Sequence, residues 1–383
     1  MGTLGTVRDA AAGAIEAWRV RKVYTRTHDN LDVDTHLREA AAWLERAQDA
    51  GPDRGVAYGA HFGGSFLPSY PETTGYIIPT FLHLADAWRE PRLRERAVRM
   101  GDWEIEIQMP NGAVMGGMVT DLPPTPAVFN TGQVLQGWAA LGRESGGARF
   151  VEAGRKAASW LLEVQDPDGS WRRGNSRFAE TGATVYNVRA AWGLYWMGVV
   201  AGEERFRRAA LRNADFACSR QLANGWFQDC CLSDPVHPLL HTIAYSMQGL
   251  LEIGLASGEA RLVDAAQRTA DSLVAILGPD GFLPGRVASD FSPAVKWCCL
   301  TGSAQTSIVL SRLGAYTGEP RYRDAALRIN RYLMARHDVS SPDPAIRGAL
   351  AGSWPVRGDY GRLMVLNWAT KFLIDALLAA REP

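Results

Sequence analysis

A five-residue turn recurs six times along this chain, and its spacing constrains the fold more than any other feature. The clearest copy is Gln165-Asp-Pro-Asp-Gly169, which ends the apolar-periodic run from Phe150 to Val164. Helices commonly end this way, because proline disfavours a helical residue before it and glycine adopts the left-handed turn conformation. The copies, degenerate at both ends of the chain, start at residues 48, 108, 165, 221, 277 and 336, with spacings of 60, 57, 56, 56 and 59 residues. Six copies at one period predict a repeat architecture.

A second series of short turns alternates with the first, and its arginines are spaced by 57, 56, 56 and 60 residues (Arg92, Arg149, Arg205, Arg261 and Arg321). Connections of about four residues join antiparallel helices, whereas the loops of roughly 15 to 25 residues on the other side have a length that usually carries function. One helix of each pair is apolar all round and the other is charged on one face, as two packed helical layers require.

These patterns predict an all-α fold, an (α/α)6 toroid of six antiparallel helix pairs with inner and outer rings and the long loops at one end. We expect residues 1–383 to form this single domain, closed rather than an open solenoid. The first outer helix should lie between Asp9 and Ala47, and short hairpins are expected at residues 114–119 and 281–285.

Composition narrows the class of partner. Lys plus Arg and Asp plus Glu are both 41, so the formal charge is zero, which argues against nucleic acid or an anionic membrane. Residues 1–22 lack the pattern of a secretory signal, no stretch approaches the roughly 20 apolar residues of a membrane span, and five cysteines form no disulfide framework. We expect a cytoplasmic protein that binds a sugar or glycoside and needs no cofactor, and the sequence leaves a homodimer open.

Several stretches resemble known enzymes. Gln165 to Trp171 is similar to the Gln-x-x-x-Gly-x-Trp repeat of terpenoid cyclases, but their Asp-x-Asp-Asp acid motif is absent. The six-pair plan resembles the six-hairpin glycosidase-like superfamily, relatives of unsaturated glucuronyl hydrolases, sugar 2-epimerases and polysaccharide lyases. The stretches 70–76, 299–305 and 367–371 look like those of bacterial proteins linked to polysaccharide or glycoside biosynthesis. The resemblance implies a sugar substrate without specifying the reaction.

Polar residues cluster where the apolar inner helices start, at the end that carries the long loops. Six of them are natural N-cap residues, and we expect them to cap: Thr73, Asn130, Asn187, Thr242, Thr301 and Asn367. Other polar side chains at these starts should face water or a ligand, and six helix N-termini would favour an anionic group on that ligand. The predicted substrate-binding residues are Tyr76, Asn130, Gln133, Tyr186, Asn187, Arg189, Trp297, Gln305, Trp368 and Lys371.

The residues at the mouth allow two kinds of sugar chemistry. Hydrolysis of a glycoside needs a carboxylic acid paired with a carboxylate, and Glu72, Asp229 and Asp359 are the best-placed acids. A lyase or epimerase needs an acid and a base about an acidic carbon, a role that suits His241 and Tyr245, four residues apart on one helix. We favour a glycoside hydrolase by a small margin.

Two alternatives from other classes remain open. One is a toroid that binds a glycan without catalysis. The other is a zinc-dependent cyclase, since the pairs Cys230-Cys231 and Cys298-Cys299 lie in neighbouring loops with His237 and His241. Vicinal cysteines rarely bind one ion and the C-x-x-C spacing is missing, so we predict no metal site.

Overall fold

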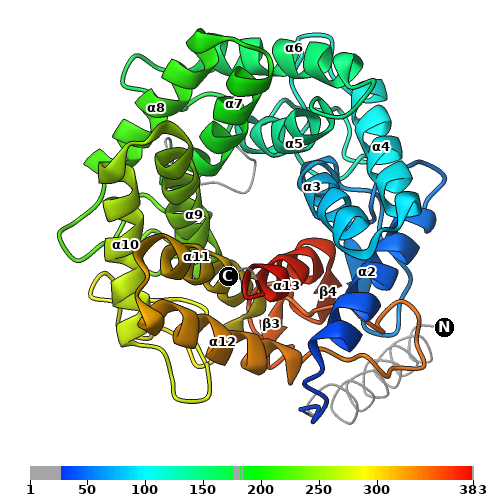
Figure 1. Ribbon diagram of the computed structural model, residues 1–383, viewed down its shortest axis with the longest axis vertical. Helices are drawn as coiled ribbons and strands as arrows, with labels where there is room; N and C mark the ends of the chain where they lie inside the picture. Colours follow the sequence, from blue (N-terminus) through cyan, green and yellow to red (C-terminus); the bar gives the residue numbers. More distant parts are fainter. Residues whose placement is uncertain (1–26, 176–181, 183, 382–383) are drawn as a thin grey trace, which may run out of the picture.

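The computed structural model describes residues 27–175, 182 and 184–381, which form a closed ring of helices in two layers (Figure 1). The outer layer consists of α2 (Val33–Asp49), α4 (Pro91–Glu106), α6 (Ala148–Val164), α8 (Glu204–Ser219), α10 (Ala260–Ala275) and α12 (Pro320–Met334). The inner layer consists of α3 (Pro71–Trp88), α5 (Val128–Leu141), α7 (Val188–Val200), α9 (Leu240–Ser257), α11 (Leu300–Thr317) and α13 (Asn367–Ala379). A single 3-10 turn, η1 (Val185–Asn187), precedes α7. The predicted all-α toroid of six helix pairs is confirmed.

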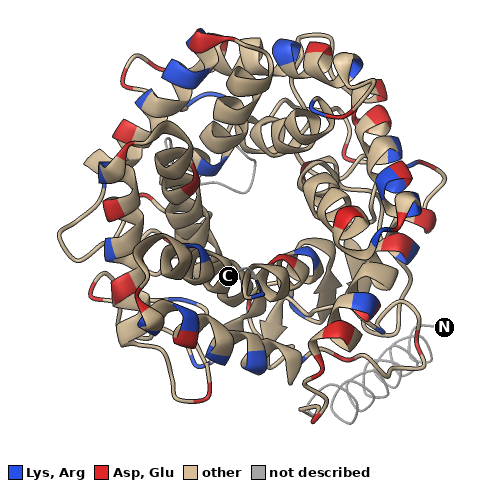
Figure 2. Cartoon of the chain, viewed as in Figure 1, with Lys and Arg blue, Asp and Glu red and all other residues tan. Residues whose placement is uncertain are grey.

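The two layers differ in burial as the sequence pattern predicts. In α5 almost every residue is buried, whereas α8 buries one face and exposes its charges. Lysine, arginine, aspartate and glutamate accordingly gather on the outer ring (Figure 2). Small residues let the inner helices approach closely, since a Cβ at Gly132 would lie 2.4 Å from the Cα of Ala190 on the next inner helix. Among the described residues, no helix combines the length and apolar character that crossing a membrane requires.

The repeated turn holds each outer helix against the next one. The amide Nε2 of Gln165 donates to the carbonyl of Gly169 (3.1 Å) and to that of Ala209 on α8 (2.9 Å). Gly169 has a φ of +85°, and a Cβ there would lie 2.4 Å from the carbonyl oxygen of Arg212 on the same helix. Gln108 and Gln221 make the corresponding pairs of hydrogen bonds to Gly112 and Ala153 and to Gly225 and Ala265. The turn therefore belongs to the scaffold.

The last turn closes the ring against the first outer helix. A Cβ at Gly348, whose φ is +82°, would lie 2.1 Å from the carbonyl oxygen of Glu39 on α2. His337, the second residue of the last copy of the repeat, brings its Nδ1 within 2.8 Å of Nδ1 of His36. Trp43 donates its indole N–H to the carbonyl of Ala345 (2.7 Å). Because α13 also packs against α2 and α3, the ring is closed and not an open solenoid.

The first outer helix, α2, lies within the predicted range of Asp9 to Ala47 except for its last two residues. It begins at Val33, where the carboxylate of Asp32 caps it by accepting a hydrogen bond from the backbone N–H of Thr35 (2.9 Å). Of the predicted range, residues 9–26 lie outside the described residues.

The short strands link distant loops, so the prediction of local hairpins is wrong. β1 (Gly59–His61) pairs antiparallel with β4 (Met364–Leu366), and β2 (Cys298–Cys299) pairs with β3 (Ser353–Trp354). The first of these pairs joins the first and last long loops across the point where the ring closes.

The prediction that six polar residues cap the inner helices is right for the position of Asn187, the N-cap of α7, and wrong for the other five. The caps of the inner helices are Tyr70, Ala127, Asn187, Leu239, Cys299 and Leu366, and none uses its side chain for a capping hydrogen bond. Most of the helices begin earlier than we predicted, which places the polar residues inside the first turn, where they fasten loops. Thr74, for example, donates to the carbonyl of Tyr70 (2.9 Å) and accepts from the backbone N–H of Val56 (2.9 Å).

Replacing Gly169 by alanine should destabilise the protein more than replacing Gly146, because only Gly169 faces a neighbouring helix. Gly146 has a similar φ of +78°, but a Cβ there would meet nothing within 4 Å. We expect Gly146→Ala to lower the free energy of unfolding by about 1–2 kcal/mol, through the strain of alanine in the left-handed conformation alone. Gly169→Ala should lower it by about 1–3 kcal/mol more, because its Cβ also meets α8. Urea unfolding of both variants measures the difference, and equal costs would contradict the contact with α8.

Acid should weaken the point of ring closure. Burial, reinforced by the neighbouring His36, lowers the pKa of His337 from 6.5 to about 3. The neutral ring therefore contributes stability that is present above pH 6.5 and is lost as the pH falls towards 3. The free energy of unfolding of the parent protein should fall when the pH is lowered from 7.5 to 5.5. In His337→Gln we expect this fall to be smaller by roughly 1 kcal/mol. Urea titrations at both pH values test this, and an equal loss in the two proteins would count against it.

Candidate active site

A cavity of about 590 Å³ opens at the end of the ring that carries the long loops. Its walls come from the starts of the inner helices: Glu72 on α3, Phe129 on α5, Tyr186 on η1, His241 and Tyr245 on α9, and Trp368 on α13. Loop residues complete it, among them Tyr58, Arg286, Asp359 and Tyr360. The inner helices thus bring residues from across the sequence to one place, which we call the mouth cavity.

Glu72 is the most perturbed carboxyl group of the mouth cavity. It lies in the first turn of α3, partly exposed because it faces the cavity, and its Oε2 accepts a hydrogen bond from the hydroxyl of Tyr70 (2.7 Å). Burial raises the pKa of Glu72 to about 7, although the Tyr70 hydrogen bond and the charge of Arg189 oppose this shift. A carboxyl group with this pKa is about half protonated at neutral pH, so it can either donate or accept a proton.

His241 faces the same cavity as a neutral imidazole. Its Nδ1 lies 2.8 Å from Oε1 of Gln305, an oxygen that can only accept, so Nδ1 carries the proton and Nε2 is unprotonated. Burial lowers the pKa of His241 to about 3. The rings of Tyr245 and Tyr360 flank it, with centroids 4.2 and 5.1 Å away.

Aromatic side chains form one wall beside Glu72. The rings of Tyr58 and Trp368 meet edge to face at 4.6 Å, and Tyr70 packs against both. The indole N–H of Trp368 donates to the hydroxyl of Tyr360 (2.8 Å). Flat apolar faces of this kind suit the apolar face of a sugar ring, and they exclude water from the carboxyl group.

A layer of four side chains, which we call the central layer, forms the floor of the mouth cavity: Tyr76, Arg189, Tyr245 and Phe372. Arg189 is fully buried, and its guanidinium lies 4.8 Å from the ring of Tyr245 and 5.1 Å from that of Phe372. Its Nε donates to Oε1 of Gln133 (3.0 Å), and its Nη1 donates to Gln248. No carboxylate of the described residues forms a salt bridge with Arg189. Its charge lowers the pKa of Glu72 in the cavity above, against the larger effect of burial.

The rim of the cavity carries an ion pair between Asp359 and Arg286. The sequence analysis predicted Asp359 as a site residue but not Arg286. Asp359 is highly exposed, and its carboxylate lies 3.5 Å from the guanidinium of Arg286, which is mostly buried. Arg286 also donates to the carbonyl of His237 (2.8 Å). Arg286 directly follows the stretch from Gly281 to Gly285 in a loop at the mouth. This position is the sequence feature from which Arg286 could have been predicted as a site residue.

Some predicted residues support the cavity from behind without lining it. Gln305 orients His241, and Gln133 holds Arg189. Asn130 is buried, and the buried Asn187 donates to Asn175 (3.1 Å).

Other predicted residues lie elsewhere. Asp229 pairs with Arg220 outside the lining of the mouth cavity. Trp297 packs on Gly285, where a Cβ would lie 2.2 Å from its ring. Lys371 and Tyr76 line a second cavity on the far side of the central layer, and Lys371 is paired there with Asp375.

The vicinal cysteines are buried. Burial raises the pKa of Cys230 and of Cys299 to about 12, and Cys230 lies 3.2 Å from the hydroxyl of Ser246. In the part of the chain that the structure describes, no three His, Cys, Asp or Glu side chains are grouped so as to hold a metal ion.

The fold matches solved structures of sugar-active enzymes over most of its length. An unsaturated glucuronyl hydrolase specific for heparin superposes with a TM-score of 0.73 at 14% identity, covering 91% of this chain and 96% of that one. The cellobiose 2-epimerase of Bacillus thermoamylovorans B4167 gives 0.72 at 9% identity, over 91% and 98%. The chain has the six-hairpin glycosidase-like fold. An alpha-amylase from Clostridium perfringens gives 0.63 at 10% identity, over 91% and 98%.

Sequence comparison adds no closer likeness. No protein-family model matches the chain, and no curated protein matches it. The identities to the solved structures are low, so these structures establish the architecture that the resemblance implied, and the reaction has to be argued from the mouth cavity.

Replacing Tyr70 by phenylalanine should raise the pKa of Glu72 above about 7. The Tyr70 hydroxyl donates to the carboxylate and favours its charged form, so its loss favours the protonated form. Carbon-13 NMR titration of the Glu72 carboxyl group in the parent and in Tyr70→Phe measures both values. An unchanged or lower pKa in the variant would contradict the arrangement described here.

Proposed function

We propose that the protein is a glycoside hydrolase that cleaves a sugar carrying an acidic group in its mouth cavity, with Glu72 as the general acid. The observation that supports this most is the pKa of Glu72, raised to about 7 by burial beside a wall of aromatic rings. General acids of glycosidases need a raised pKa of this kind to be protonated at neutral pH.

The proposed reaction uses two carboxyl groups. Glu72 donates its proton to the glycosidic oxygen as the bond between that oxygen and the anomeric carbon breaks. A water molecule attacks the anomeric carbon, and the carboxylate of Asp359 accepts the proton that the water loses. Asp359 suits the base role because it is exposed at the rim of the cavity, where its carboxylate lies 3.5 Å from the guanidinium of Arg286.

An acidic group on the substrate is favoured by the charges around the mouth cavity. Arg286 lines the cavity, Arg189 lies beneath it without a carboxylate partner among the described residues, and the inner helices direct their N-termini towards it. The solved structures of similar fold include unsaturated glucuronyl hydrolases, one of them specific for heparin. A uronic acid is therefore the substrate class that we propose.

A lyase or epimerase is the second candidate, and the tautomer of His241 favours it. With Nδ1 donating to Gln305, the unprotonated Nε2 could remove the proton from the carbon beside a carboxylate, with Tyr245 or Glu72 returning one. A lyase would release a product with a new double bond that absorbs in the ultraviolet. An epimerase would incorporate solvent deuterium, whereas a hydrolase gives only new reducing ends.

Three further proposals concern the whole protein. We propose that residues 1–383 form one domain, that the protein acts in the cytoplasm, and that its partner is a sugar and neither nucleic acid nor a membrane. A homodimer stays a prediction, which light scattering at several concentrations would test. A toroid that binds a glycan without catalysis is the outcome if binding persists but no conversion of any uronic-acid substrate is found.

Replacing Glu72 by glutamine should abolish most activity on the uronic-acid disaccharide that the parent protein cleaves fastest. We expect kcat to fall about 10²- to 10⁴-fold with little change in affinity, because the amide cannot donate the proton that the acid supplies. In the parent, kcat/KM should fall as the pH rises through about 7, since the protonated form of Glu72 is the active one. This alkaline limb should disappear from the residual activity of Glu72→Gln.

The matched control is Asp290→Asn, which removes an exposed loop carboxylate that does not line the mouth cavity. It should retain activity within about twofold. Full activity in Glu72→Gln, or an alkaline limb that survives the substitution, would contradict the assignment of Glu72 as the acid.

A further inference from the structure

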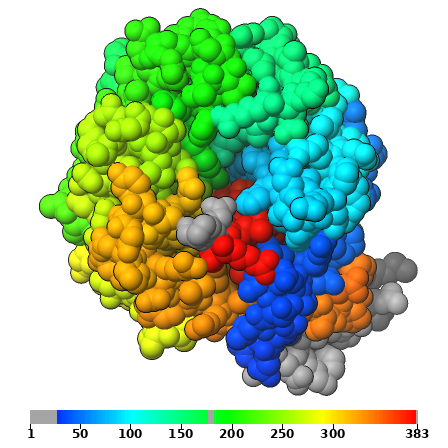
Figure 3. All heavy atoms as spheres, viewed as in Figure 1, coloured from blue at the N-terminus to red at the C-terminus, as the bar shows by residue number. Residues whose placement is uncertain are grey.

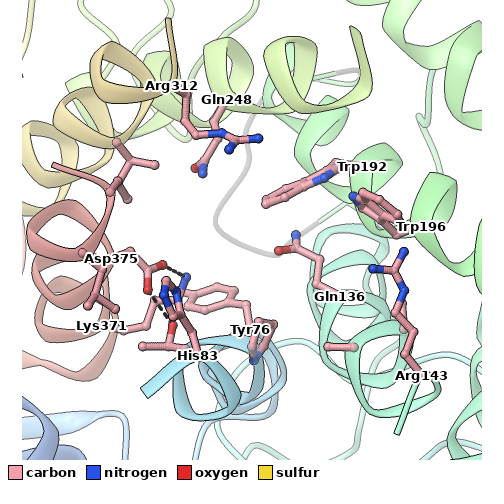
Figure 4. A pocket seen from close by; sticks show the side chains of 17 residues that line it. Tyr76, His83, Gln136, Arg143, Trp192, Trp196, Gln248, Arg312, Lys371 and Asp375 are labelled. Carbon is pink, nitrogen blue, oxygen red and sulfur yellow. Dashed lines mark hydrogen bonds and ion pairs between the residues drawn. The ribbon is translucent and has the colours of Figure 1, made fainter. Parts of the chain in front are cut away.

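A second cavity, of about 320 Å³, lies at the opposite end of the ring. Figure 3 shows this end of the molecule hollowed at the centre of the ring, and Figure 4 shows the side chains that line the hollow. The central layer separates it from the mouth cavity, since Tyr76 lines the second cavity while Tyr245 lines the first. Its volume lies near the lower end of the roughly 300–1,000 Å³ typical of ligand pockets, enough for a compound of one ring.

Two tryptophans form one wall of the second cavity. Trp192 and Trp196 stand four residues apart on α7, so their indoles lie on one face of the helix (Figure 4). The Nε1 of Trp192 is buried and has no hydrogen-bond partner among the described residues. A buried N–H without a partner costs free energy, and an acceptor on a bound molecule would remove that cost.

Positive charge exceeds negative charge around this cavity. The lining contains Lys371, Arg143 and Arg312 but only one carboxylate, Asp375, which pairs with Lys371 and accepts from Thr80 (2.7 Å; Figure 4). Arg312 pairs with Glu252, outside the lining, at 3.3 Å.

Arg143 is the cation most available to a ligand. It stacks on the ring of Trp196 at 4.3 Å, and no carboxylate of the described residues forms a salt bridge with it. Stacking holds the guanidinium at the rim with its N–H groups free to donate.

Helix ends alone do not account for these cations. The C-terminal end of a helix carries partial negative charge and favours a cation nearby, which explains Arg143, two residues after α5. Lys371, however, lies five residues into α13, far from its C-terminal end, and Arg312 stands five residues before the end of α11. Gln136 and Gln248, both nearly fully buried, add amide groups between the cations.

We propose that the second cavity binds a small ring compound carrying one carboxylate. The ring packs against the indoles of Trp192 and Trp196. The carboxylate accepts hydrogen bonds from Arg143 at the rim, and the Nε1 of Trp192 donates to a second acceptor on the compound. Sugar acids and aromatic acids share this chemistry, and the test separates them.

The test is isothermal titration calorimetry of the purified full-length protein with glucuronate and with benzoate. Glucose is the neutral analogue of glucuronate, and benzamide is that of benzoate. We expect at least one acid to bind about tenfold or more tightly than its neutral analogue, since charge-assisted hydrogen bonds require the carboxylate. Tighter binding of glucuronate would identify sugar acids as the ligand class, and tighter binding of benzoate would identify aromatic acids.

Variants assign the binding to the second cavity. Arg143→Gln should weaken it about tenfold, and Trp192→Phe, which keeps a ring but loses the N–H, should weaken it a few-fold. Arg208→Gln on α8, an exposed residue that does not line the cavity, should bind like the parent. Thermal melts of all variants check that they fold. The proposal is overturned if neither acid binds, if the neutral analogues bind equally well, or if Arg143→Gln binds like the parent.

Discussion

The contact between a turn glycine and the backbone of the next outer helix is the constraint on which this structure depends. At Gly169 and Gly348 there is no room for a Cβ against the neighbouring helix, and φ is positive at both. Each outer helix is thereby held at a set distance from the next, and after six pairs the last turn meets α2. Ring closure then leaves the inner helices only one arrangement, with all their N-termini at the same end. The mouth cavity follows from this packing.

The packing around Glu72 gives its carboxyl group a raised pKa. A carboxyl group in the first turn of a helix is ordinarily charged, because the helix N-terminus favours an anion. Here the aromatic rings of Tyr58, Tyr70 and Trp368 remove enough water to outweigh that preference. The central layer completes the effect from below by closing the ring interior. It also divides the interior into two cavities whose walls differ in charge, one with a perturbed acid and the other with an excess of cations.

The fold could be predicted from the sequence because its signal is repeated. Two interleaved turn series with one period specify six helix pairs and the end at which the long loops lie, even where single copies are degenerate, as at His337. The residues Glu72, Tyr186, His241 and Trp368 were placed at the mouth for the same reason, since each stands at the start of an inner helix.

The incorrect predictions concern local geometry, which the period of the sequence repeat does not specify. Several inner helices begin earlier than their polar residues suggested, as at Tyr70 before Thr73, which turned expected caps into side chains inside the first turn. For Lys371 the same shift places the ammonium below the central layer. Arg286 and Asp229 lie in long loops. The pairing of Arg286 with Asp359 is a contact between loops distant in sequence, and Asp229 has a positive φ and pairs with the nearby Arg220.

The most direct test of the account is a crystal structure of Glu72→Gln soaked with the uronic-acid disaccharide that the parent protein cleaves. The account predicts the glycosidic oxygen within hydrogen-bonding distance of the residue 72 side chain, a sugar ring against Trp368 or Tyr58, and the carboxylate of the sugar directed towards Arg286. A disaccharide bound with its glycosidic bond away from residue 72, or bound outside the mouth cavity altogether, would contradict the account.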